Sequence, residues 1–282
     1  MRRILELCLV LSLMATQGAA DQIGGRDVVI SDLRQDKTVP APLVVMLHGA
    51  FGSPARFQRY SRFDRAGARA DVMVVYAKSA RRAWRDGRFD GDPVDVDYLV
   101  DLIARMQADP RVAPGKVLIF GHSSGGGMAM RMACARPDLV AGIGVVATKV
   151  LLDARCATGA AVPAVFVHGT ADPIAPNAGR PVGDRKGGTL SAADSLSLWA
   201  ARNGCRGPGP ATRQDQVPGD GTVLITREYQ GCQAGLTHFV LDGAGHGWPV
   251  GEVIRRRRVG PMSAEMDAGA ALLARLRPLL RP

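Results

Sequence analysis

The stretch Val117-Leu118-Ile119-Phe120-Gly121-His122-Ser123-Ser124-Gly125 decides the fold, because an apolar, β-prone run passes through a G-x-S-x-G pattern into a helix-like stretch from Met128 to Arg136. A strand that turns at once into a helix strains the central residue, and side chains two positions away would collide, so both flanking positions need glycine. This setting predicts that Ser123 projects from a sharp turn as a nucleophile, with a helix N-terminus behind it.

Short apolar runs alternate with helical stretches along the rest of the chain. This alternation predicts an α/β fold in which a mainly parallel central sheet carries helices on both faces, and the length of 282 residues fits a single domain. The expected strands are Leu43 to Leu47, Val72 to Tyr76, Val117 to Phe120, Ile143 to Ala147, Val165 to Val167 and His238 to Leu241. The expected helices are Asp95 to Gln107, Gly125 to Arg136, Ser191 to Asn203 and Ser263 to Leu280.

The N-terminus has the pattern of a signal peptide. Arg2 and Arg3 precede an apolar run from Ile4 to Ala15, and small residues follow up to Ala20. We expect cleavage after Ala20, which leaves residues 21–282 as the catalytic domain and predicts a secreted protein, extracellular or periplasmic. The apolar run is too short for a membrane anchor, so none is expected.

Cysteine usage agrees with an oxidising compartment. Loss of Cys8 with the leader leaves four cysteines, and four allow three disulfide pairings. Sequence order favours the local pairs, Cys134 with Cys156 and Cys205 with Cys232. Glycine and proline cluster between the second pair, which predicts a stapled excursion from the sheet.

The net charge of +10 is carried mostly by arginine and would attract anions in general. The one dense basic run, Arg255 to Arg258, precedes the expected last helix and indicates a solvated loop or a cell-surface contact. No aromatic stacking pattern accompanies the charge, so we expect no nucleic-acid partner.

A serine nucleophile needs a base within hydrogen-bond reach and an acid that orients the base. His246 follows an apolar run in a Gly-rich loop and is the expected base; Asp172, after another strand-like run, is the expected acid. The order Ser123, Asp172, His246 is that of α/β-hydrolases. Asp242 is the alternative acid, but it lies very near His246 along the chain.

Charge that develops on the substrate carbonyl oxygen needs two N–H donors. The backbone N–H of Ser124 is the expected first donor. The second is expected from the glycine-containing loop after Leu47, where Ala50 is the first choice and Phe51 the second.

The ordered motifs LHGAFGS, GHSSGGGMAM, HGTADPIAP and GAGHGWP resemble a secreted esterase family that includes polyhydroxybutyrate depolymerase-like proteins and feruloyl or acetylxylan esterases. The resemblance runs from about Leu43 to Pro249 and implies an α/β-hydrolase fold with Ser123, Asp172 and His246 as its triad. The cysteine pair Cys205 and Cys232 also resembles a feature of that family.

These observations predict a serine carboxylic ester hydrolase that acts through an acyl-enzyme without cofactor or metal. Trp84, His122 and Trp248 are expected to line its substrate pocket. The leading substrates are short hydroxyalkanoate or small acyl esters, soluble or polymeric, with feruloyl or acetylxylan esters as the nearest alternative. A peptidase that uses the same triad is a weaker alternative. The rival of another class is a non-catalytic, basic surface-binding protein on a hydrolase scaffold.

Overall fold

A computed structural model describes residues 21–87, 93–152, 156, 159–181, 183, 187–250, 255–256 and 259–280. The expected signal peptide lies outside these residues. No helix in the described part is long and apolar enough to cross a membrane.

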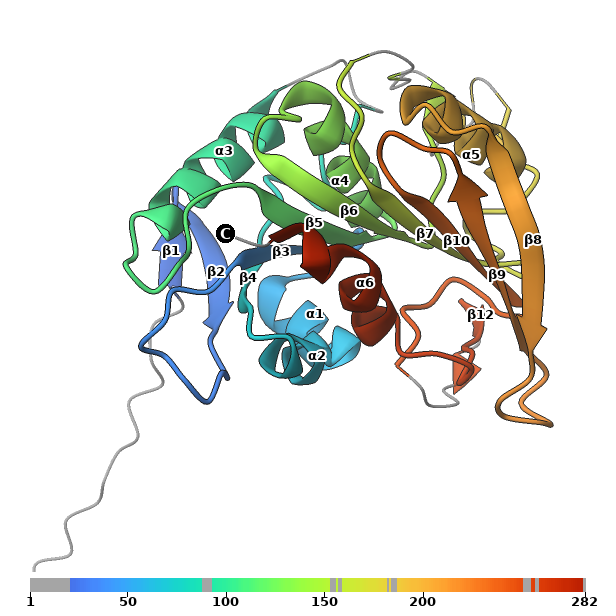
Figure 1. Cartoon of the computed structure of the whole chain (residues 1–282), viewed down its shortest axis with the longest axis horizontal. Helices are drawn as coiled ribbons and strands as arrows, with labels where there is room; N and C mark the ends of the chain where they lie inside the picture. The colour runs from blue at the N-terminus through green and yellow to red at the C-terminus, as the bar shows by residue number, and fades with distance from the viewer. Residues whose placement is uncertain are drawn as a thin grey trace, which may run out of the picture.

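The described chain is built on a ten-stranded sheet (Figure 1). Its five parallel pairings join six strands in the middle, and antiparallel strands extend it at both edges. In spatial order the strands are β1 (Asp21–Ile23), β2 (Arg26–Ser31), β4 (Met73–Ala77), β3 (Leu43–Leu47), β5 (Val117–His122), β6 (Val140–Val146), β7 (Ala164–Gly169), β10 (Leu236–Asp242), β9 (Val223–Gln230) and β8 (Gly207–Gln214).

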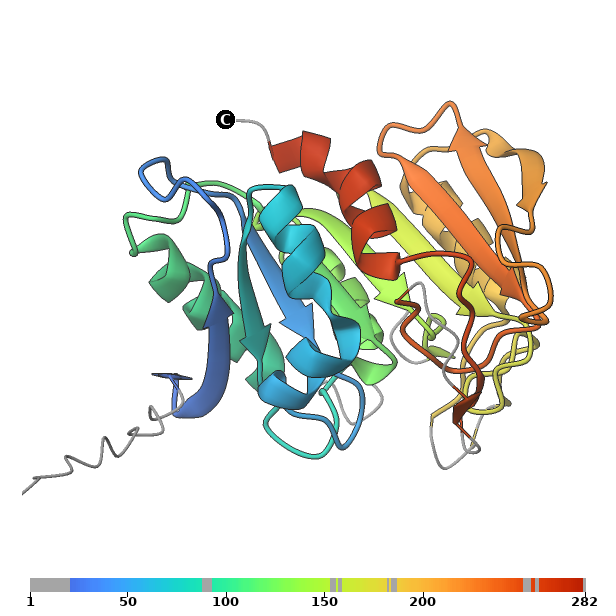
Figure 2. The same ribbon diagram turned by 90° about the horizontal axis from the view of Figure 1, so that it is seen from below.

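Helices cover both faces of the sheet (Figures 1 and 2). One face carries α3 (Val94–Gln107), α4 (Ser124–Ala135) and α5 (Ala192–Arg202); the other carries α1 (Pro54–Ser61), α2 (Phe63–Arg69) and α6 (Ala268–Leu276). Residues of β3 alternate between the two cores, with Val45 on the first face and Val44 and Met46 on the second. Double-sided burial explains why these strands read as continuous apolar runs.

The expected α/β architecture is confirmed, and every expected strand is present. Leu43–Leu47 keeps its expected bounds, and the ends of the others differ by up to three residues. The edge strands β1, β2, β8 and β9 and the helices α1 and α2 were not anticipated. Exposed strands with mixed polarity, such as β8, lack the apolar signal of the central ones. The last helix begins at Ala268 rather than Ser263, because the Asp267 side chain caps it by accepting from the Ala270 N–H.

The segment between Cys205 and Cys232 was wrongly expected to leave the sheet. It forms β8 and β9, which pair antiparallel with each other and, through β9, with β10. Backbone pairing at a free sheet edge needs no apolar pattern, so composition alone did not reveal it. The two expected disulfides, Cys134–Cys156 and Cys205–Cys232, are confirmed.

The basic run is described only at Arg255–Arg256, which form β11. This short strand pairs antiparallel with β12 (Gly260–Pro261). The rest of the run lies outside the described residues.

Candidate active site

Ser123 sits at the turn between β5 and α4 with φ 54° and ψ −121°, outside the conformations that side chains favour. Gly121 and Gly125, two positions before and after Ser123, have no room for a side chain. A Cβ on Gly121 would lie 2.1 Å from the backbone of Gly125, and a Cβ on Gly125 would lie 2.2 Å from the carbonyl oxygen of Leu47. The pattern therefore lets α4 pass directly against β3 and holds Ser123 at the carboxyl end of the sheet.

Asp172 and His246 form a buried pair at the same edge of the sheet. The Asp172 Oδ2 and His246 Nδ1 atoms are 2.7 Å apart, and the two residues are 4% and 5% exposed. Asp172 follows β7, and His246 follows β10, which pairs with β7 in parallel. The two residues are 74 positions apart in the sequence, but the parallel pairing brings them within hydrogen-bond distance. The structure thus brings the expected acid to the expected base.

Hydrogen bonds favour the ionised form of the Asp172 carboxyl group. Burial raises the pKa of Asp172, but the hydrogen bond to His246 and the backbone N–H groups of Ala175 and Ile174 outweigh it, so the pKa falls below its usual value. The alternative acid, Asp242, accepts a hydrogen bond from Thr170 and pairs with Arg213 instead.

His246 lies beside the nucleophile turn. Its ring centroid is 5.1 Å from that of His122, the residue before Ser123. The backbone N–H of His246 donates to the carbonyl of Val259 at 2.6 Å, which fixes the loop that carries the base.

The loop after β3 lies over the nucleophile. A Cβ on Gly49 would be 3.4 Å from the Cβ of Ser123 and 2.9 Å from His122 Nδ1, so a larger residue here would force the His122 ring to shift. Ser124 begins α4, as an oxyanion donor at a helix N-terminus should. The Phe51 N–H donates to the carbonyl of Arg82 at 2.5 Å and is therefore engaged elsewhere, which leaves Ala50 as the candidate second donor.

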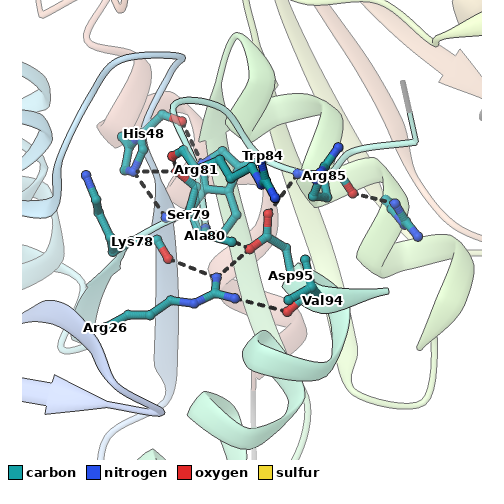
Figure 3. A network of polar contacts seen from close by, with 11 residues as sticks. Arg26, His48, Lys78, Ser79, Ala80, Arg81, Trp84, Arg85, Val94 and Asp95 are labelled. Carbon is teal, nitrogen blue, oxygen red and sulfur yellow. Dashed lines mark hydrogen bonds and ion pairs between the residues drawn. The ribbon is translucent and has the colours of Figure 1, made fainter. Parts of the chain in front are cut away.

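A network of buried polar contacts supports the loop after β3 on its core side (Figure 3). The indole N–H of Trp84 donates to the carbonyl of His48 at 2.8 Å, and the Ser79 N–H donates to His48 Nε2 at 3.4 Å. Burial lowers the pKa of His48 to about 4, so the ring is neutral at neutral pH and accepts at this nitrogen.

The segment that carries Trp84 is itself anchored by Asp95, the second residue of α3. The fully buried Asp95 carboxylate accepts from the backbone N–H groups of Ala80 (3.0 Å) and Arg85 (2.8 Å). The guanidinium of Arg26 on β2 pairs with the same carboxylate. Sequence reasoning missed Asp95, because an acidic residue in the first turn of a helix reads as an ordinary surface charge.

Residues 44–259 match the alpha/beta hydrolase family. The chain belongs to this family. "Putative esterase NocK" of Nocardia uniformis subsp. tsuyamanensis is 29% identical over 234 residues, which cover 74% of this chain and 66% of NocK. Feruloyl esterase B of Piromyces equi is 24% identical over 219 residues, which cover 73% of this chain and 39% of that protein.

Among solved structures, acetyl xylan esterase from Aspergillus awamori superposes with a TM-score of 0.55 at 15% identity, covering 79% of this chain and 89% of that chain. At this identity the likeness is one of fold. The chain spans between about two fifths and two thirds of the length of the two sequence relatives. The expected resemblance to α/β-hydrolase esterases is confirmed.

The structure corrects two pocket residues expected in this α/β hydrolase. Trp84 and Trp248 are both 0% exposed, so neither side chain lines a surface that substrate can reach. Trp84 supports the loop after β3, and Trp248 packs edge-on against Phe57 of α1 at 5.3 Å between ring centroids. Sequence reasoning placed them by nearness to the motifs, which does not reveal the direction of a side chain.

His122 does lie beside the site, half-buried between aromatic rings. Its ring stacks on Phe57 and meets Tyr60 edge-on, with centroids 6.4 Å and 5.8 Å away. The Tyr60 hydroxyl also accepts from the backbone N–H of Trp248 at 2.8 Å, so it links α1 to the loop of the base. Tyr60 was missed because no helix was expected there.

The described residues of this α/β hydrolase contain no candidate metal site. There, no group of three or more His, Cys, Asp or Glu side chains is placed to hold a metal ion.

Proposed function

We propose that this α/β hydrolase is a serine carboxylic ester hydrolase with Ser123 as nucleophile, His246 as base and Asp172 as acid. The observation that carries the proposal is the strained Ser123 turn, closed by two obligatory glycines, beside a buried Asp172–His246 pair 2.7 Å apart. Strain of this kind persists only where the surrounding structure imposes it, and it clusters at functional sites.

The reaction proceeds in two halves. His246 removes the hydroxyl proton as Ser123 Oγ bonds to the ester carbonyl carbon, and the N–H groups of Ser124 and Ala50 stabilise the oxyanion. The carbon–oxygen bond to the alcohol then breaks, and His246 returns the proton to the leaving alcohol. Water, activated by His246, cleaves the acyl-enzyme and releases the acid. Asp172 stays ionised throughout and stabilises the imidazolium.

Substrate class is proposed from the motifs and from one exposed aromatic side chain. Phe51, on the loop after β3, is 71% exposed and offers an apolar face to an acyl or aryl group. Short hydroxyalkanoate or other small acyl esters are the first candidates, as the motif resemblance implies. Feruloyl or acetylxylan esters are the second, supported by the relative named feruloyl esterase B.

Export is proposed from the signal-peptide pattern of residues 1–20. Two disulfides in the described residues agree with an oxidising compartment.

Labelling with a fluorophosphonate probe tests the nucleophile. Mature, oxidised protein should label covalently and turn over at least one member of a panel of p-nitrophenyl acyl esters, hydroxybutyrate oligomers, methyl ferulate and acetylated xylan. The Ser123→Ala variant should do neither. Folded wild-type protein that neither labels nor turns over any ester would overturn the proposal and favour the rival reading as a basic surface-binding protein.

A further inference from the structure

In the turn after Asp172, the backbone N–H groups bind the acid and the backbone carbonyls bind two cationic side chains. Asp172 Oδ1 accepts from the backbone N–H groups of Ile174 and Ala175, each at 2.8 Å, while Oδ2 faces His246. The carbonyls of the same two residues accept from cations: the Arg180 guanidinium donates to the Ile174 carbonyl, and the Lys149 ammonium donates to the Ala175 carbonyl.

Lys149 is an unusual residue to find there. It follows β6 in the turn after Ala147, and it is only 1% exposed. Burial of an ammonium group is costly unless the group is paired, and the Lys149 ammonium donates to a neutral backbone carbonyl, that of Ala175. The carboxylate of Asp172 acts on it at longer range, since it opposes the fall in the pKa of Lys149, to about 8, that burial causes.

We infer that Lys149 and Arg180 form a cationic clamp that positions the catalytic acid. Arg180 binds the carbonyl of the peptide unit between Ile174 and Ala175, and the N–H of that same unit donates to Asp172 Oδ1. A cation on the carbonyl polarises the unit and strengthens the hydrogen bond that its N–H donates. Lys149 holds the next carbonyl, so the turn cannot rotate its N–H groups away from Asp172.

The clamp rests on the proposed function, because it acts only through the acid of the triad. Asp172 works by orienting His246 and by stabilising the imidazolium that forms during attack. A loosened turn therefore weakens an interaction made in the transition state and leaves substrate binding alone. The clamp residues are positioning residues; neither touches the reacting atoms.

The test is a double-mutant cycle. Lys149→Met keeps roughly the length of the side chain but removes its charge and donor. Arg180→Gln removes the charge of the half-buried guanidinium and shortens the side chain. Each is measured in the wild-type and Asp172→Asn backgrounds by kcat, KM and the rate of fluorophosphonate labelling. We expect each variant to lower kcat and the labelling rate about tenfold with KM within twofold. In the Asp172→Asn background, where no anion remains to hold, the added loss should be below threefold.

Lys116→Met is the matched control. Lys116 is exposed, and its ammonium also donates to a backbone carbonyl, that of Pro137 at 3.1 Å. This variant should retain full activity. Should Lys149→Met fail to fold, Arg180→Gln carries the same cycle.

Wild-type kcat in folded Lys149→Met and Arg180→Gln would overturn the clamp, as would an equal loss in both backgrounds or a loss confined to KM. These outcomes differ from failure of the proposed function, in which the wild type itself neither labels nor hydrolyses esters.

Discussion

Replacement of Trp84 by phenylalanine tests whether this side chain supports the loop after β3 or only fills the core. Trp84→Phe keeps the aromatic ring but deletes the N–H that donates to the His48 carbonyl at 2.8 Å. That carbonyl belongs to a residue that is 1% exposed, so water does not replace the lost donor. An orphaned buried carbonyl costs about 1–3 kcal/mol, and the smaller ring adds a cavity term, so we expect a loss of about 2–4 kcal/mol in the free energy of unfolding.

The effect on catalysis follows from the position of His48, two residues before the candidate donor Ala50. Complete loss of one oxyanion donor costs about 2.7–4 kcal/mol in similar sites. A displaced loop that loses half of this, about 1.4–2 kcal/mol, lowers kcat about 10- to 30-fold. Urea unfolding at pH 7.5 gives the stability, and steady-state hydrolysis of the best p-nitrophenyl ester gives kcat and KM.

Trp199→Phe is the matched control. Trp199 is 1% exposed, and its indole N–H donates to the carbonyl of Val162 at 3.3 Å rather than to the loop after β3. The Val162 carbonyl also accepts from the side-chain amide of Asn203 at 2.9 Å, so this variant should lose mainly the cavity part of the stability and keep its kcat. If Trp84→Phe retains kcat within twofold, or if Trp199→Phe loses as much kcat as Trp84→Phe, then Trp84 does not support the loop after β3 in catalysis.

Three further outcomes are expected. Gly125→Ala should lose fluorophosphonate labelling and about 3 kcal/mol or more of stability, because its Cβ would lie 2.2 Å from the Leu47 carbonyl oxygen and force α4 from β3; denaturant unfolding and probe labelling measure this. Removal of the Cys134–Cys156 bridge, which closes a separation of 22 residues, should lower the free energy of unfolding by about 3 kcal/mol in urea titrations of the double Cys→Ser variant. Acid should destabilise the fold through His238, since burial lowers its pKa to about 4 while the unfolded chain takes up a proton near pH 6.5. Its contribution is complete above pH 6.5 and declines toward pH 4, with about 2 kcal/mol lost at pH 5, measured by unfolding at pH 7 and pH 5.

Controls decide each of these outcomes. Gly235→Ala should be neutral, since no atom lies within 4 Å of the Cβ it would add; equal loss in both glycine variants would refute the steric argument. Unchanged unfolding of the cysteine variant would show that the bridge does not restrain the unfolded chain. His238→Gln should reduce the loss between pH 7 and pH 5 by about 2 kcal/mol, while His48, whose pKa burial also lowers to about 4, keeps its own share. An unaltered slope would place the proton uptake at other residues.

The triad candidates could be taken from the sequence because each follows a strand with a strong local signal. Ser123, Asp172 and His246 come after β5, β7 and β10, and neighbouring parallel strands bring their carboxyl ends to one edge of the sheet. The order of the motifs thus predicts which residues can meet, and the structure places Asp172 and His246 2.7 Å apart.

The sequence by itself determined the central strands and the glycines of the nucleophile turn, because periodicity and steric crowding are local properties. For the cysteines it favoured the local pairs among three possible pairings, and the structure decided between them. Only the tertiary structure decided that Trp84 faces the core, that β8 and β9 extend the sheet, and that Lys149 and Arg180 meet the turn of the acid. Each of these depends on which side chain or strand edge of one segment meets a partner segment, often far along the chain. A single buried lysine or tryptophan carries no sequence signal for that partner, since burial and hydrogen bonding arise only when the segments pack.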